Sequence, residues 1–124
     1  MSVKGIGTDI VAVARITAAL SRQPSFAARI LTPPELEQMQ TVREPGRLLA
    51  KRFAAKEACL KALGTGLAKG MSWHDIEVRH TDAGQPYIVL EGAAGLRAEH
   101  LGVTEVQLSI SDETDYAVAF VVLT

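Results

Sequence analysis

Cysteine, an excess of one charge and long apolar runs are scarce or absent in this chain. Among its 124 residues there is one cysteine, Cys59, which excludes an internal disulfide and a zinc site built from several cysteines. No apolar run approaches the roughly 20 residues of a membrane span, and the first residues lack the apolar core of a signal peptide. A net charge of −1 gives no bulk attraction to nucleic acid or to membranes. We therefore expect a cytoplasmic protein that recognises its partners at local sites.

The pattern of apolar residues predicts an α+β fold in one domain over residues 1–124. An alternating, β-branched stretch over residues 3–13 indicates a strand that ends near Asp9 or Ile10, followed by a helix from Val13 to Leu20. Further strands are expected over residues 73–80, 87–90, 106–111 and 116–123, and short helices over 33–41 and 93–100. The strand at 116–123 is apolar on both faces, so we expect helices of the chain or another subunit to cover both sides. The predicted architecture is a largely antiparallel sheet packed against helices.

The longest predicted helix runs from about Arg47 to Leu63 and ends at Gly64. One apolar stripe along it should face the core; its members are Leu49, Phe53, Leu60 and Leu63. Glu57 lies inside this stripe, where a carboxylate is out of place. Asp9 is similarly placed in a predicted strand.

Asp9 and Glu57 each need a partner, because burying an unpaired ionised carboxylate is costly. A shared cation would satisfy both, and oxygen ligands favour a hard ion such as Mg²⁺. Since Mg²⁺ completes its shell with water and substrate phosphates, so sparse a site suggests a phosphate or pyrophosphate substrate. Lys61, one turn after Glu57, could reach an anion bound there. The alternative is that Glu57 and Lys61 form an ordinary surface ion pair.

Other residues support more than one interpretation. The segment Gly64-Thr65-Gly66 could bring backbone N–H groups to a phosphate, or could only end the helix. Arginines recur every seven residues at Arg15, Arg22 and Arg29, which gives either one basic binding face or a solvated surface; Pro24 should interrupt a helix between them. Trp73 is expected to be a core or interface aromatic residue.

Four segments together resemble the holo-acyl-carrier-protein synthases, the short bacterial-type branch of the 4′-phosphopantetheinyl transferases. They are GIGTDIVAVARI (5–16), RILTPPEL (29–36), KRFAAKEACLKALGTG (51–66) and LSISDETDYAVAFVVL (108–123). The resemblance implies transfer of the 4′-phosphopantetheine group of coenzyme A to a serine of apo acyl carrier protein, with release of adenosine 3′,5′-bisphosphate, for fatty acid biosynthesis. It also implies a homotrimer with an active site at each subunit interface.

The same resemblance implies roles for single residues. Asp9 and Glu57 would bind Mg²⁺, Lys61 would contact the phosphates, and Glu57 would take the serine proton directly or through a water. Coenzyme A would also contact Gly64, Thr65 and Gly66, and a neighbouring subunit would add Gly84, Pro86, Ser109 and Ser111. The basic face of Arg15, Arg22 and Arg29 would dock on an acidic helix of the carrier protein.

One position departs from the family pattern. Many members have a histidine where this chain has Asp112, so a role for that histidine is not carried over, and Asp112 is expected to be only a turn residue. Two rival functions remain open. One is a Mg²⁺-dependent hydrolase of nucleotide pyrophosphates, and the other is a non-enzymatic, oligomeric binding module in which Asp9 and Glu57 are structural.

Overall fold

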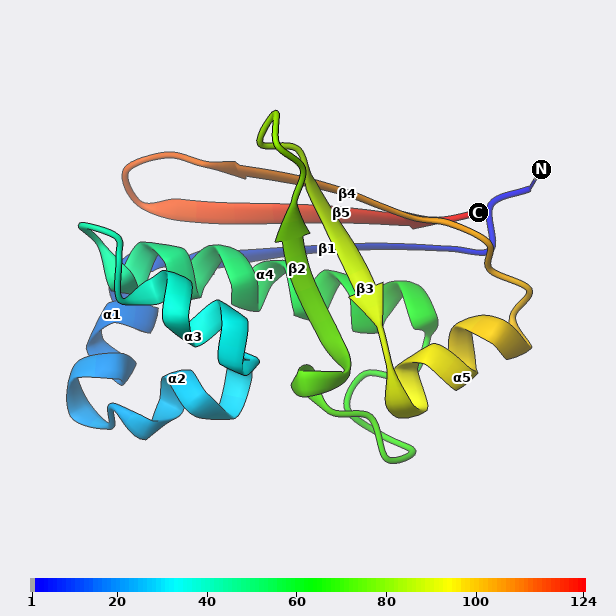
Figure 1. Cartoon of the computed structure of the whole chain (residues 1–124), viewed down its shortest axis with the longest axis horizontal. Helices are drawn as coiled ribbons and strands as arrows, with labels where there is room; N and C mark the ends of the chain where they lie inside the picture. The colour runs from blue at the N-terminus through cyan, green and yellow to red at the C-terminus, as the bar shows by residue number, and fades with distance from the viewer. Residues whose placement is uncertain (1) are drawn as a thin grey trace.

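The computed structural model describes residues 2–124, with Met1 outside the described residues. A three-stranded antiparallel sheet in the order β1-β5-β4 lies along one long helix, and a separate hairpin, β2-β3, crosses that helix (Figure 1). The elements in chain order are β1 (Gly5–Ala12), α1 (Val13–Arg22), α2 (Ser25–Ile30), α3 (Pro33–Met39), α4 (Pro45–Leu63), β2 (Ile76–His80), β3 (Pro86–Leu90), α5 (Gly92–His100), β4 (Val106–Asp112) and β5 (Tyr116–Leu123). The predicted α+β class is confirmed. Within residues 2–124, every helix falls short of the combined length and apolarity of a membrane span.

Helix α4 is the centre of the fold, and its two ends follow from the sequence. Pro45 lies in the first turn, where a missing N–H removes no helical hydrogen bond. Gly64 ends the helix in the left-handed conformation, with φ of 81°, and its N–H reaches the carbonyls of Leu60 and Lys61. Of the predicted stripe, only Phe53 is partly exposed; the three leucines are buried. The predicted helix is therefore confirmed, with its start two residues earlier.

Strand β1 lies directly on α4 because it has glycine at two inward positions. A Cβ atom at Gly5 would overlap the carbonyl oxygen of Ala62, and one at Gly7 would overlap that of Ala58. Only glycine permits this approach of strand backbone to helix backbone. The GIG segment is thus a packing motif.

The prediction that this first strand ends near Asp9 or Ile10 is wrong. Strand β1 continues to Ala12, and Asp9 pairs with Ala119 inside the ladder. The strand continues because β5 supplies an antiparallel partner as far as Tyr116, which is opposite Ala12. Asp9 is therefore held by a regular strand and its position is fixed.

The two faces of the three-stranded sheet differ. On β5, one face packs on α4 and is fully buried, with Ala117, Ala119, Val121 and Leu123 at most 1% exposed. The other face keeps Tyr116 and Phe120 at 49% and 46% exposure, and no helix of residues 2–124 covers it. Both faces of this strand were expected to be covered, and the chain's own helices cover one of them only.

Two other predicted boundaries need correction. The strand expected over residues 73–80 begins only at Ile76, because Trp73–Asp75 form a 3-10 turn. Ser72 and Asp75 stabilise this turn: the Ser72 hydroxyl accepts from the His74 N–H, and the Asp75 carboxylate accepts from the Ser72 N–H. The helix expected over 33–41 ends at Met39.

Candidate active site

Asp9 and Lys61 meet at the free edge of the sheet, where β1 lies against α4. The Lys61 ammonium group donates to the Thr8 carbonyl at 2.9 Å and to Asp9 Oδ1 at 3.1 Å. The side chain of Asp9 is 18% exposed and that of Lys61 is 56% exposed. The partner of Lys61 is thus Asp9, and the alternative of a Glu57–Lys61 ion pair is wrong for residues 2–124.

Glu57 lies one turn before Lys61 on α4 and is held by Trp73. The indole Nε1 of Trp73 donates to Glu57 Oε2 at 3.1 Å. The Trp73 ring packs against Phe53 at a centroid distance of 6.0 Å, and Phe53 packs against Phe26 at 6.4 Å. Trp73 is therefore more than the core or interface aromatic expected from the sequence, because its polar edge binds a candidate site residue.

Each of the two carboxylates keeps one oxygen available. Within residues 2–124, no hydrogen bond from the protein reaches Asp9 Oδ2 or Glu57 Oε1. The same residues contain no cluster of three or more His, Cys, Asp or Glu side chains suited to a metal ion. Two free carboxylate oxygens, one from Asp9 and one from Glu57, are ligands of the type that a hard divalent ion takes together with water and phosphate. The donor set is compatible with Mg²⁺ on these grounds.

A second ionic cluster lies on another side of α4 and is buried. The Lys56 ammonium group donates to the Ile30 carbonyl at 2.7 Å, to Glu35 Oε1 at 2.6 Å and to the Trp73 carbonyl at 3.2 Å. Burial lowers the pKa of Lys56, and the Glu35 carboxylate opposes this shift. Arg52, 3.9 Å from Glu35, also has a pKa lowered by burial.

Sequence reasoning missed this buried cluster, although a signal was present. Lys56 lies seven residues after Leu49 and seven before Leu63, in the middle of the apolar stripe. A lysine at such a position needs a buried acceptor. Glu35 fills that role, and its other oxygen accepts from the Val78 N–H.

The remaining predicted coenzyme A contacts are spread over one chain. Gly64, Thr65 and Gly66 directly follow α4, close in sequence to Lys61. Ser109 and Ser111 are exposed on β4, which β5 separates from β1. Gly84 lies in the turn of the β2-β3 hairpin, and Pro86 begins β3 and lines a cavity of about 210 Å³ with residues of β4. One chain therefore pairs Asp9 with Lys61 and carries Glu57 one helical turn before Lys61, but it leaves the other residues on separate surfaces.

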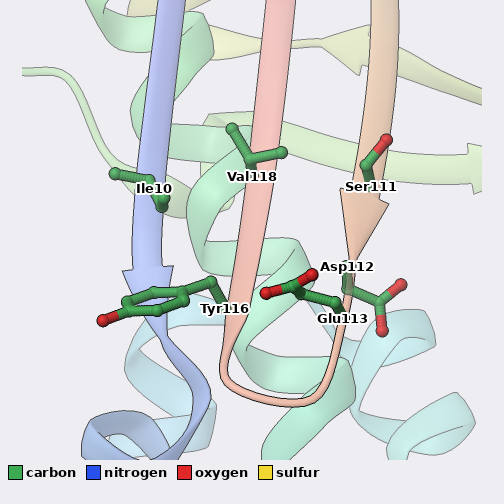
Figure 2. Close-up of a pocket in the computed structure, with 6 residues that line it drawn as sticks. All are labelled: Ile10, Ser111, Asp112, Glu113, Tyr116 and Val118. Atoms are coloured by element: carbon green, nitrogen blue, oxygen red, sulfur yellow. The ribbon is translucent and has the colours of Figure 1, made fainter.

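An open pocket of about 310 Å³ lies at one end of the uncovered sheet face. Figure 2 shows Ile10, Tyr116 and Val118 on β1 and β5, with Ser111, Asp112 and Glu113 at the end of β4. The pocket is lined both by Ser111, a predicted coenzyme A contact, and by Ile10, which follows Asp9 in β1.

The expectation that Asp112 is only a turn residue is wrong. It ends β4 and forms ion pairs with Arg47 at 3.2 Å and Lys51 at 3.6 Å. Arg47 also donates to the carbonyls of Glu113 and Thr114, so these contacts tie the β4-β5 turn to α4.

The three arginines spaced by seven lie on two helices. Arg15 and Arg22 are on α1, Arg29 is on α2, and the helix is interrupted at Gln23 and Pro24. All three are exposed, and residues 13–30 contain no carboxylate side chain. The continuous helical face therefore includes two arginines, with the third on the next helix.

Comparison with known proteins agrees with these observations. The family model described as the 4′-phosphopantetheinyl transferase superfamily matches residues 5–121. The chain is 51% identical to the holo-acyl-carrier-protein synthase of Vibrio cholerae serotype O1 (strain M66-2) over 120 residues, which are 96% of this chain and 95% of that protein.

Solved structures agree in fold. The holo-acyl-carrier-protein synthase of Neisseria meningitidis matches with a TM-score of 0.92 and 43% identity over 99% of both chains. That of Helicobacter pylori in complex with coenzyme A matches with a TM-score of 0.84 and 32% identity, over 96% of this chain and 99% of that one. This chain therefore belongs to the 4′-phosphopantetheinyl transferase superfamily, among the holo-acyl-carrier-protein synthases.

Proposed function

We propose that this chain transfers the 4′-phosphopantetheine group of coenzyme A to a serine of apo acyl carrier protein. Its similarity to holo-acyl-carrier-protein synthases over nearly the whole chain, one of them solved with coenzyme A, supports this activity. Within the chain, the supporting observation is the open cluster formed by the Asp9–Lys61 pair between β1 and α4 and by Glu57, one helical turn before Lys61. A cytoplasmic location and a role in fatty acid biosynthesis are part of the same proposal.

The reaction makes one P–O bond and breaks another. The serine oxygen attacks the phosphorus of coenzyme A that carries the pantetheine arm, and adenosine 3′,5′-bisphosphate leaves with the electron pair of the broken bond. Lys61, whose side chain is 56% exposed, would bind phosphate oxygens and stabilise the charge that develops on them. The Glu57 carboxylate would accept the serine proton directly or through a water.

Asp9 and Glu57 would also hold a divalent ion such as Mg²⁺. When bound, the ion would neutralise negative charge on the pyrophosphate. The regular pairing of β1 with β5 fixes the backbone of Asp9, and the Trp73 indole orients Glu57. The pair thus presents its free oxygens from rigid elements, as a binding site requires.

A homotrimer would complete the coenzyme A pocket. The uncovered sheet face exposes Ile6, Ile10 and Phe120 at 62%, 64% and 46%, an apolar surface that association would bury. In this proposal a neighbouring subunit supplies Gly84, Pro86, Ser109 and Ser111 to the site that contains Asp9. Sedimentation equilibrium should then give three times the chain mass of 13.3 kDa, whereas a monomer would contradict the shared pocket.

The carrier protein would dock on Arg15, Arg22 and Arg29. These exposed arginines lie in a segment, residues 13–30, that has no carboxylate, which suits an acidic partner and steers its approach. Arg15→Glu and Arg22→Glu should each lower kcat/KM for the carrier by about 10-fold, with a flatter salt dependence. The matched control is Lys4→Glu, which makes the same charge change next to the start of β1. Kinetics equal to those of the control would assign these arginines to a solvated surface.

The intact mass of the carrier protein tests the whole proposal. Incubation with coenzyme A, Mg²⁺ and apo carrier should add one phosphopantetheine group to the carrier and release adenosine 3′,5′-bisphosphate. A pyrophosphate hydrolase would cleave coenzyme A equally well without the carrier, and a binding module would leave both unchanged. An unmodified carrier would reject the transferase.

A further inference from the structure

We propose that Trp73 is a positioning residue for Glu57, and that Lys56 fixes Trp73 from the other end. This inference rests on the proposed function, because it treats Glu57 as a cation ligand and proton acceptor. Its basis is a clamp made by two consecutive residues of α4. Lys56 binds the backbone carbonyl of Trp73, and Glu57 accepts from its indole N–H.

The contact between Trp73 and Glu57 restricts a side chain that would otherwise move freely. Glutamate has several rotatable bonds, and Glu57 receives no other hydrogen bond from residues 2–124. A hydrogen bond to an ionised acceptor is stronger than a neutral one, so the N–H at 3.1 Å selects one orientation of the carboxylate. It occupies Oε2 and leaves Oε1 for a ligand. The ring is supported by Phe53, one turn before Glu57.

The backbone at Trp73 and its neighbours is held in three ways. Lys56 reaches its carbonyl, Ser72 and Asp75 hold the 3-10 turn, and the adjacent His74 ring contacts the Ala28 carbonyl at 2.7 Å. Lys56 has three N–H donors and three acceptors, and its side chain is 0% exposed. Its ammonium group therefore acts on the protein itself and has no donor left for a phosphate.

The test compares Trp73→Phe with the unmodified protein and with Phe26→Leu. Trp73→Phe keeps an aromatic ring against Phe53 but removes the N–H donor. Phe26→Leu is the matched control, because it alters the far end of the aromatic row without touching Glu57. Loss of a side chain that orients a metal ligand typically weakens affinity by about 10- to 100-fold. Because Glu57 keeps its own ligand oxygens, we expect about 10-fold weaker Mn²⁺ binding, measured by water-proton relaxation, in Trp73→Phe and no change in the control.

Kinetics separate positioning from a general structural role. The Mg²⁺ concentration for half-maximal transfer should rise in Trp73→Phe, while kcat at saturating Mg²⁺ changes less. Equal Mn²⁺ affinity in Trp73→Phe and the unmodified protein would overturn the inference while leaving the transferase intact.

A third measurement needs no substitution at Trp73. This residue is the chain's one tryptophan, so its fluorescence reports on the site. Mn²⁺ should change the emission of the unmodified protein but not that of Glu57→Gln. The inference would also be overturned if water-proton relaxation showed bound Mn²⁺ but the tryptophan emission did not change on adding it. If the unmodified protein binds no divalent ion at all, the metal role proposed for Glu57 fails, and this inference fails with it.

Discussion

Two ionic clusters on α4 begin at consecutive residues, and they differ in how completely their atoms are paired. In the buried cluster, Lys56 and Glu35 are 0% and 1% exposed, and every ammonium hydrogen has an acceptor. In the open cluster, Asp9 and Glu57 each keep an oxygen without a protein donor among residues 2–124. The Lys56 ammonium group can therefore act only on the protein itself, whereas the two free carboxylate oxygens can accept a ligand. At these two lysine-containing clusters, unused acceptors indicate a binding site better than charge does.

The largest expected effect is that of Glu57→Gln on transfer. Loss of the proton acceptor and of one anionic ligand should lower kcat by about 10³-fold. The melting temperature should remain close to that of the unmodified protein, because a glutamine amide oxygen still accepts from the Trp73 indole. Transfer to the carrier and a thermal melt measure the two quantities. Full activity would remove Glu57 from the mechanism.

Lys56→Met should lower the stability of the fold, whereas Glu57→Gln lowers transfer. It leaves the Glu35 carboxylate buried without its main partner, which should lower the free energy of unfolding by about 3–5 kcal/mol. Adding Glu35→Gln should restore much of this loss, since a neutral side chain then faces a neutral one. Urea unfolding of the single and double variants measures both changes. A single variant as stable as the unmodified protein would mean that the buried pair does not stabilise the fold.

Lys61→Met sharpens the comparison, because it also removes a lysine from an ion pair on the same helix. The pair with Asp9 is partly exposed, so its loss should change the free energy of unfolding by about 1 kcal/mol or less. Transfer should fall by about 10²-fold, since one donor to the phosphates is removed. Urea unfolding and initial rates distinguish the two outcomes. A large loss of stability with normal transfer would place Lys61 among the structural residues.

The smallest expected effect concerns pH and His80, beside the buried cluster. Partial burial, followed by the charges of Arg52 and Lys51, lowers the pKa of His80 below its ordinary value of 6.5. The unfolded chain therefore binds this proton more readily than the folded one. The stability that the folded chain gains from keeping His80 neutral should be fully present above pH 6.5, and it should be lost as the pH falls through the lowered pKa.

Thermal melts at a series of pH values test this linkage. His80→Gln should flatten the pH dependence of Tm just below pH 6.5, while His100→Gln serves as the matched control. The effect should be modest because the imidazole is largely exposed. Identical slopes for the two variants would show that another group causes the pH dependence.

The sequence predicted the elements of the fold well because their boundary signals are local. Pro45 and Gly64 mark the ends of α4 within a few residues, and the strands at the C-terminus alternate clearly. The errors occur where a distant partner decides. Strand β1 passes Asp9 because β5 pairs with it, and residues 73–75 leave the strand pattern because Ser72 and Asp75 satisfy a turn.

The candidate site was predictable only in part. Asp9 and Glu57 stood out because each carboxylate interrupts an apolar pattern. Their actual partners could not be read from spacing, because Lys61 pairs across 52 positions with Asp9 and Trp73 reaches back 16 positions to Glu57. The residues expected from a neighbouring subunit lie on surfaces that a single chain does not join.

Because β1 has glycine at two inward positions, its tolerance of substitution should alternate along the strand. Ile6 and Ile10 point away from α4, so changes of side-chain size there leave the strand where it is. At Gly5 and Gly7, even a methyl group would overlap a helix carbonyl and push the strand outward, carrying Asp9 away from Lys61. A displacement of about 1 Å can lower a rate by about 10²-fold. Within one chain, the outward positions of β1 therefore tolerate changes of size that the inward glycines do not, and the inward glycines set how closely Asp9 approaches Lys61 of α4.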